Sequence, residues 1–239
     1  MNKIVLKNVS KAYKDVKALD NINLEILENK ITGLLGTNGA GKSTLIKILT
    51  GEIKPDNGTI SIFGIDIKDI DEIRKIVNVS PQESAIISNL TVYENLEFFE
   101  HLYGINDAML IDDIMMLFNL KEFKNKRSKT LSGGYKKRLS IAISLITRPR
   151  ILFLDEPTLG LDVIARRDLW RIIMKISKST TIVITSHYLE EIESLCEDVI
   201  ILSKGHVASK GSVNDIKKLS GCDSFEDAFV KIVGENDEI

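Results

Sequence analysis

Alternation of apolar and polar side chains marks three stretches of this sequence. Ile4 to Val9 alternates, Ala18 to Leu27 does so less strictly, and Thr59 to Phe63 alternates as well. Because successive side chains of a strand point to opposite faces, this period predicts strands with one buried face. Half-buried strands are typical of antiparallel sheets, so we expect an antiparallel β region near the N-terminus.

Three other stretches are continuously apolar. They are Ile31 to Leu35, Ile151 to Leu154 and Ile182 to Ile184. Such runs predict central parallel strands that are covered on both faces. Each run is followed by polar residues and then by a helix-like pattern, which is the arrangement expected when ligands bind at the carboxyl ends of a parallel sheet.

The stretch from about 83 to 147 has a mostly helical pattern. Thr91 and Glu94 form a capping box that predicts a helix start, and an apolar pattern of helical period follows them. We interpret this stretch as a helical lobe inserted into an α/β core.

Two further helices are expected within this lobe. Ala108 to Leu120 is amphipathic, and we expect Met115 and Met116 to belong to its buried face. Another helix is expected to begin near Ser132 and to end before Pro149. We therefore expect one domain over residues 1–239, with the core at 1–82 and 148–215, the helical lobe at 83–147 and a short helical tail at 216–239.

Composition and charge exclude several classes of protein. The net charge is -2, from 32 basic and 34 acidic side chains, which gives no electrostatic reason to expect nucleic acid as a partner. Cys196 and Cys222 have neither the spacing nor the neighbours of a zinc site, so we expect two reduced thiols. The first residues do not resemble a signal peptide, and no apolar run approaches the ~20 residues of a membrane helix. If the protein serves a membrane, we expect a partner to span it.

A phosphate-binding loop follows the first apolar run. It matches the pattern G-x-x-x-x-G-K-[ST] and comprises Gly36, Thr37, Asn38, Gly39, Ala40, Gly41, Lys42, Ser43 and Thr44. Glycines let backbone N–H groups turn inward, and the next helix adds donors at its N-terminus. In such loops the lysine reaches the β- and γ-phosphates and the serine binds Mg²⁺. The pattern predicts nucleotide binding; the alternative is a glycine-rich turn with a chance lysine.

Two acids end the second apolar run. Asp155 at the strand end is in place to hold Mg²⁺, usually through water. Glu156, one residue further, would face the γ-phosphate and polarise the attacking water. The alternative is that both acids cap the next helix.

A second anion-binding segment consists of Ser132, Gly133 and Gly134, which open a predicted helix. One nucleotide needs only one such cradle from its own chain, so we infer that two chains enclose each nucleotide. This segment resembles the signature of the nucleotide-binding domain of ABC transporters, and the resemblance extends over essentially the whole chain. It implies a P-loop NTPase fold of class α/β, with a mainly parallel central sheet, an N-terminal antiparallel β subdomain and an inserted helical lobe. It also implies an ATPase that couples hydrolysis of ATP to transport.

The resemblance assigns roles to further residues. Tyr13 matches the aromatic residue that stacks on adenine, and Gln82 matches the glutamine that senses Mg²⁺ and links the site to the helical lobe. Asp162 matches the acid of a loop that crosses the dimer interface. His187 matches the switch histidine, which would bond the γ-phosphate and steady the catalytic water. Each of them has a plainer alternative as an ordinary surface, turn or core residue.

The expected site therefore falls into overlapping sets. The expected catalytic residues are Glu156, His187, Gln82 and Lys42. The expected Mg²⁺ ligands are Ser43, Gln82 and Asp155. The nucleotide contacts are expected from Tyr13, the loop from Gly36 to Thr44, Ser132, Gly133, Gly134 and Asp162.

One position departs from the family pattern, and two segments suggest a branch of the family. The signature usually continues with glutamine, whereas this chain has Tyr135, which leaves open what replaces that amide. The continuation 135–138 and the ending 224–230 resemble the branch that exports drugs, antibiotics, polysaccharides or lipids through separate membrane subunits. The resemblance implies a homodimer or heterodimer of ATPase subunits on a polytopic permease, at the cytoplasmic face of the membrane, with unknown cargo.

Two other classes of function compete with export. One is an ABC protein that acts on DNA or ribosomes, which the single cassette and the near-neutral charge disfavour. The other is a regulatory or immunity protein that binds ATP without transport, which the presence of both Glu156 and His187 disfavours.

Overall fold

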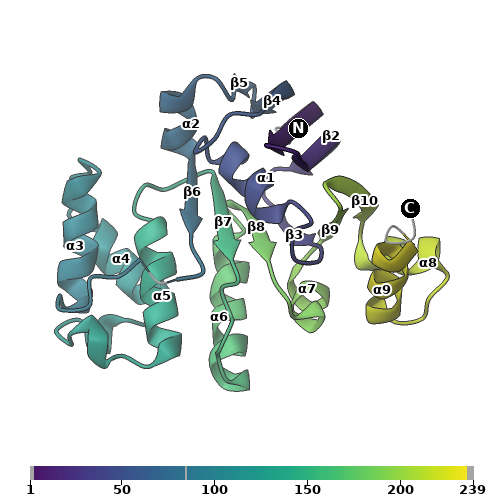
Figure 1. Ribbon diagram of the computed structural model, residues 1–239. Coiled ribbons are helices and arrows are strands. Elements are labelled where there is room, and N and C mark those ends of the chain that lie inside the picture. The colour runs from purple at the N-terminus through teal and green to yellow at the C-terminus, as the bar shows by residue number, and fades with distance from the viewer. Residues whose placement is uncertain (1–2, 84, 236–239) are drawn as a thin grey trace.

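A computed structural model describes residues 3–83 and 85–235 of this protein (Figure 1). The two ends of the predicted domain, at 1–2 and 236–239, and Ser84 within the predicted helical lobe lie outside the described residues.

The larger of two sheets has the strand order β10-β9-β3-β8-β7-β6. Its strands are β3 (Ile31–Leu35), β6 (Val77–Ser80), β7 (Ile151–Asp155), β8 (Thr181–Thr185), β9 (Asp198–Ser203) and β10 (His206–Gly211). Neighbours from β9 to β6 are parallel, and β10 is antiparallel to β9. The three continuously apolar runs are β3, β7 and β8, so the prediction of central parallel strands is confirmed.

Both faces of this sheet are covered at its centre, and this explains why the central strands are mainly apolar. On β7, Leu152 and Leu154 belong to a core shared with the helices, while Ile151 and Phe153 belong to a second core on the opposite face. All four side chains are fully buried. Because alternate residues of a strand face opposite sides, a polar residue at any of these positions would be buried.

The second sheet is antiparallel and has the order β2-β1-β4-β5. Its strands are β1 (Lys3–Tyr13), β2 (Val16–Leu27), β4 (Asn57–Ile62) and β5 (Ile65–Asp66). The predicted antiparallel region is confirmed. Helix α1 (Lys42–Leu49) contributes Leu45, Ile48 and Leu49 to the core between the two sheets. The phosphate-binding loop is thereby anchored between them.

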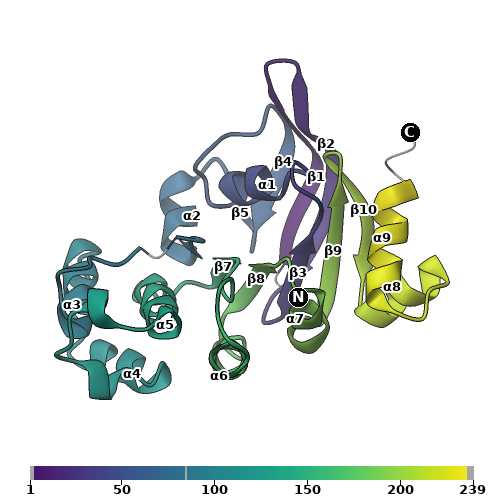
Figure 2. The ribbon, with the colours of Figure 1, turned by 60° about the horizontal axis from the view of Figure 1, so that its bottom comes forward.

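The remaining helices lie at the two ends of the larger sheet and on the face opposite to the antiparallel sheet. They are α2 (Ile70–Ile76), α3 (Val92–Leu102), α4 (Leu110–Leu117), α5 (Gly133–Ser144), α6 (Val163–Ile176), α7 (Leu189–Leu195), α8 (Val213–Ser220) and α9 (Phe225–Glu235), with short 3-10 turns η1 (Lys121–Phe123) and η2 (Ser128–Thr130). Helices α3, α4 and α5 lie together beyond β6, and α8 and α9 lie beyond β10 at the opposite end (Figures 1 and 2). The α/β class inferred from the sequence is that of the structure.

Helix α3 begins as predicted. The Thr91 hydroxyl accepts a hydrogen bond from the Glu94 N–H, and the Glu94 carboxylate accepts one from the Thr91 N–H. The prediction for Met116 is wrong, because its side chain is 58% exposed whereas Met115 is 1% exposed. The buried positions of α4 are Leu110, Ile111, Ile114 and Met115. Met116 lies about 100° further around the helix and faces outward.

The division into core, lobe and tail stays a prediction, and its last boundary, between 215 and 216, falls inside α8. Cys196 and Cys222 are free thiols in the described part of the chain. Among residues 3–83 and 85–235, no helix has the length and apolar character needed to cross a membrane.

Replacing Thr91 by Ala is expected to lower the free energy of unfolding by about 1 kcal/mol, because the Glu94 N–H loses its acceptor at the first turn of α3. Thr91→Ser retains the hydroxyl and is the matched control. Urea denaturation of the two variants and the wild type checks this. Equal losses in Thr91→Ala and Thr91→Ser would show that the methyl group, not the cap, carries the effect.

Candidate functional site

An open cavity of about 370 Å³ lies at the carboxyl ends of β3, β7 and β8. The phosphate-binding loop contributes Thr37, Asn38, Gly39, Ala40, Gly41, Lys42, Ser43 and Thr44 to its lining, and the other lining residues are Val16, Ala18, Gln82, Asp155, Glu156 and His187. The parallel strands thus bring together groups that are far apart in the sequence. Val16 and Ala18 were not expected from the sequence, which carries no motif at these positions.

Two glycines of the loop are required by its geometry. Gly41 has φ 105°, and a Cβ there would lie 2.5 Å from the Ala18 carbonyl oxygen. A Cβ on Gly36 would lie 2.3 Å from the Leu202 carbonyl oxygen. Any side chain at these positions would push the loop away from its neighbouring strands, so the cradle depends on both glycines.

Lys42 points back into its own loop. Its Nζ donates hydrogen bonds to the carbonyl oxygens of Gly36, at 2.6 Å, and Thr37, at 3.1 Å. Burial lowers the pKa of Lys42, and the negative charges of Glu156 and Asp155 oppose this shift. A further anion within reach of the ammonium group would therefore be bound favourably.

Asp155 and Glu156 are both held by Thr185 of the neighbouring strand. The Thr185 hydroxyl donates to Asp155 Oδ1 at 2.6 Å, and it accepts a hydrogen bond from the Glu156 N–H at 3.1 Å. Glu156 has φ 50°, which is unfavourable for a residue other than glycine. A strained backbone of this kind persists only where its surroundings fix it, and the contacts to Thr185 are part of that support.

The Glu156 and His187 side chains contact each other at the end of the cavity. His187 Nε2 lies 2.9 Å from Glu156 Oε1, and the Glu156 side chain is 7% exposed. Burial raises the pKa of Glu156 and Asp155 adds to this, while His187 and Lys42 act in the opposite direction. A carboxylate with a raised pKa beside an imidazole is suited to accept a proton near neutral pH.

Lys137 is a site residue that motif reasoning did not identify. It lies on α5, its side chain is buried, and its Nζ donates a hydrogen bond to the Gln82 carbonyl oxygen at 2.5 Å. Burial lowers the pKa of Lys137, and Asp155 and Glu156 oppose the shift. The available signal was its helical position, since Lys137 lies one turn before the fully buried Ile141 on the same face.

The second anion-binding segment lies at the start of α5, outside this cavity. Ser132 is the N-cap of α5, and its hydroxyl makes no capping hydrogen bond within the described residues. Asp162 caps α6 by accepting hydrogen bonds from the N–H groups of Ile164 and Ala165, each at 2.9 Å. A Cβ on Gly134 would lie 3.2 Å from the Ala165 Cβ, so the two helix starts are neighbours. The side chain that caps α6 is that of Asp162, not of Asp155 or Glu156.

Two aromatic residues complete the comparison with the sequence. Tyr13 is 47% exposed, and it is not among the described residues that line the cavity; its strand partner Val16 is. Tyr135 packs on Phe123, with ring centroids 4.1 Å apart, and the Arg138 guanidinium lies over its ring at 4.9 Å. Tyr135 therefore has a packing role within its own chain.

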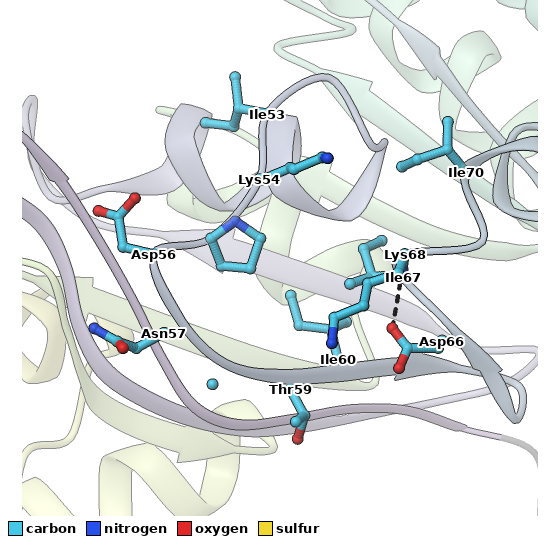
Figure 3. A pocket seen from close by; sticks show the side chains of 12 residues that line it. Ile53, Lys54, Asp56, Asn57, Thr59, Ile60, Asp66, Ile67, Lys68 and Ile70 are labelled. Carbon is cyan, nitrogen blue, oxygen red and sulfur yellow. Dashed lines mark hydrogen bonds between the residues drawn. The ribbon is translucent and has the colours of Figure 1, made fainter.

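A separate hollow of about 470 Å³ lies between the end of α1, β4 and the start of α2 (Figure 3). Ile53, Ile60, Ile67 and Ile70 line it. Its acids have protein partners: Asp56 pairs with Lys11 at 2.6 Å and Asp66 accepts the Lys68 N–H at 2.9 Å. None of the expected site residues is among the described residues around this hollow, so it is distinct from the cavity at the carboxyl ends of β3, β7 and β8.

The residues expected to hold Mg²⁺ fit such an ion. Ser43, Gln82 and Asp155 line the same cavity and offer a hydroxyl, an amide and a carboxylate oxygen. Oxygen ligands of this kind, few in number and completed by water and phosphate oxygens, are what Mg²⁺ requires.

Comparison with known proteins identifies a family and its relatives. The family model described as ABC transporter matches residues 19–159. The human phospholipid-transporting ATPase ABCA3 is 37% identical over 91% of this chain and 13% of its own length. The probable multidrug ABC transporter ATP-binding protein YbhF of Escherichia coli is 34% identical over 98% of this chain. This chain spans 42% of the length of YbhF.

Solved structures show the same fold over most of the chain. A structure described as the ATP binding subunit of an ABC transporter has a TM-score of 0.85, with 28% identity, and covers 96% of this chain and 99% of its own. The cassette MJ0796, solved as a dimer in a post-hydrolysis state bound to ADP and Pi, has a TM-score of 0.76 and 28% identity, over 87% of this chain and 98% of its own. CbiO1 from Clostridium perfringens, described as part of the ABC transporter complex cbiONQ, has a TM-score of 0.82 and 26% identity, over 91% of this chain and 96% of its own.

Replacing Glu156 by Gln is expected to stabilise the fold near neutral pH. Because the folded-state pKa of Glu156 is raised above 4.5, the contribution of Glu156 to stability is fully present below pH 4.5 and is lost as pH rises through the raised pKa. The difference in unfolding free energy between Glu156→Gln and wild type should therefore grow over this pH range. Chemical denaturation at several pH values measures it, with Glu190→Gln as an exposed control. A difference that does not change with pH would contradict burial of the charged form.

Proposed function

This chain belongs to the ABC transporter family and is an ATPase domain of that family, and we propose that it powers export through a membrane permease as one half of a head-to-tail dimer. The observation that carries the proposal is the cavity in which Lys42, Asp155, Glu156 and His187 meet. A second anion-binding segment at Ser132 lies outside that cavity. Each chain thus provides one phosphate-binding cavity and, at Ser132, a segment that would complete the cavity of a second chain.

Within the cavity, each group has a role in ATP hydrolysis. Lys42 and the loop N–H groups bind the phosphate chain, whose negative charge favours the ammonium form of Lys42. Glu156 accepts a proton from the attacking water, which its raised pKa favours. His187, 2.9 Å from Glu156, orients that water and the carboxylate. Mg²⁺, held by Ser43, Asp155 and Gln82, neutralises charge on the phosphate oxygens when it is bound.

Across the dimer, Ser132, Gly133 and Gly134 of one chain would contact the γ-phosphate held by the other. Among the described residues, the Ser132 hydroxyl makes no capping hydrogen bond to the N–H groups at the start of α5, which supports this role. The dimeric structure of MJ0796 with ADP and Pi supports the arrangement by similarity. Asp162, at the neighbouring helix start, would face the same interface.

The remaining partner is proposed to be a polytopic permease. Support comes from CbiO1, described as part of a transporter complex, and from YbhF, described as a probable multidrug transporter protein. The proposal places this chain on the cytoplasmic face of the membrane, bound through the permease. Cargo would be recognised mainly by the permease.

Replacing Glu156 by Gln is expected to lower ATP turnover by about 10²- to 10⁴-fold, because the amide cannot accept the proton of the attacking water. The variant should still bind ATP and should accumulate as a nucleotide-dependent dimer. Phosphate release and size-exclusion chromatography with MgATP test both parts. Full ATPase activity in Glu156→Gln would remove Glu156 from the role of base.

The protein is expected to co-purify with a polytopic subunit when detergent-solubilised membranes are fractionated under native conditions. Mass spectrometry of the purified complex identifies the partner. Isolation with ribosomes or DNA would favour the second class of function. ATP binding without turnover, even with the natural partner present, would favour a regulatory protein.

A further inference from the structure

One buried carboxylate that the proposed chemistry does not use belongs to Glu191 on α7. Its exposed fraction is 0%. The Trp170 Nε1–H donates a hydrogen bond to Glu191 Oε1 at 2.8 Å, and the Thr158 hydroxyl donates one to Glu191 Oε2 at 3.0 Å. Because a buried carboxylate is unfavourable unless hydrogen bonds satisfy it, both donors are needed where they are.

The partners of Glu191 come from the segments that carry the catalytic residues. Thr158 lies two residues after Glu156, in the loop that leaves β7. Ser186, which also hydrogen-bonds the Glu191 side chain, directly precedes His187. Trp170 lies on α6, the helix that Asp162 caps. A single carboxylate therefore connects the Glu156 loop, the His187 loop and α6.

The electrostatic surroundings of Glu191 show a connected cluster. Burial raises the pKa of Glu191, and hydrogen bonds from Ser186, Trp170 and Thr158 lower it, as does the charge of Arg166. The Arg166 guanidinium lies near the Trp170 ring, at 5.7 Å, and near the Tyr188 ring, at 5.2 Å. Arg166 and Trp170 on α6 and Tyr188 next to α7 therefore lie close together around Glu191.

Such a connection matters because the Glu156 backbone is strained. Its φ of 50° must be imposed from both sides of the residue. Thr185 fixes the backbone on the strand side through the Glu156 N–H. Thr158, anchored by Glu191, fixes the loop on the other side. We propose that Glu191 is a positioning residue that keeps Glu156 and His187 in contact by tying their two loops together; this rests on the proposed ATPase function.

The alternative is that Glu191 only stabilises the fold. A positioning role predicts a loss of kcat with little change in the KM for MgATP, because the hydrogen-bond partners described for Glu191 are Thr158, Trp170 and Ser186 and not the phosphate-binding loop, so the loss falls on the reacting geometry. A purely structural role predicts a lower melting temperature with unchanged kcat per folded molecule. Steady-state kinetics therefore separates the two roles.

The test compares variants of the purified full chain. Glu191→Ala removes both acceptors and is expected to lower kcat by about 10- to 100-fold, with the KM within about threefold of wild type. Thr158→Val removes only the link to the Glu156 loop and should lower kcat in the same direction. Glu191→Gln should restore most of the activity, because its amide oxygen can accept from Trp170 and its NH₂ can donate to Thr158. Glu193→Gln, at an exposed position of the same helix, is the matched control and should retain wild-type kinetics.

A spectroscopic measurement reports the network directly. Trp170 is the one tryptophan of the chain, so its fluorescence is free of other tryptophan signals. Its emission should shift to longer wavelength in Glu191→Ala and stay near wild type in Glu191→Gln.

Folded Glu191→Ala with wild-type kcat would overturn the positioning role, as would a loss of kcat that Glu191→Gln fails to restore. If Glu191→Ala does not fold, Thr158→Val decides the matter by the same criterion: wild-type kcat overturns the role. A wild-type protein that hydrolyses no ATP, even with its natural partner present, would instead overturn the proposed function, which distinguishes the two failures.

Discussion

The site depends on the fact that the parallel strands β3, β7 and β8 end side by side, at the same edge of the sheet. In their register, Leu34 and Asp155 are both paired with Thr185. The residues that follow each strand therefore emerge at one edge: the phosphate-binding loop after β3, Glu156 after β7 and His187 after β8. A shift of one residue in any of these pairings would exchange the side chains between the two cores and would separate the proposed catalytic groups at the same time. The same hydrophobic burial thus fixes both the fold and the chemistry.

The features that follow a local period could be predicted from the sequence. Continuous apolar runs identified β3, β7 and β8, alternation identified the antiparallel strands, and the capping box identified the start of α3. The phosphate-binding loop was recognisable because its glycines and lysine have a fixed spacing. These signals are local, since each depends on residues within one or two turns of each other.

The contacts that span distant segments could not be predicted in the same way. Lys137 reaches Gln82 across 55 residues, and Glu191 reaches Thr158 across 33. A local pattern identifies neither partner: the helical position of Lys137 indicates burial at most, and a buried glutamate has the same letter as a solvated one. The prediction that Met116 is buried was wrong for a related reason. Adjacent apolar residues on a helix point in different directions, and the sequence alone does not say which of them faces the core. Val16 and Ala18 enter the cavity only because β2 lies over the loop, where Gly41 approaches the Ala18 carbonyl.

Burial shifts the pKa values of two side chains in the cavity in opposite directions. Burial lowers the pKa of Lys42 and raises that of Glu156, so each charge is maintained against the loss of solvent. The strained backbone at Glu156 adds a further unfavourable contribution. In the proposed function, a polyphosphate with its metal ion would supply anionic oxygens to Lys42 and positive charge close to Asp155, so binding would relieve part of the electrostatic cost that folding leaves in place. The contacts of Thr185, and the support proposed for Glu191, keep the Glu156 side chain in its buried position. Without them Glu156 could turn toward solvent and recover its ordinary pKa. The site is therefore prearranged for charge that its own chain does not provide.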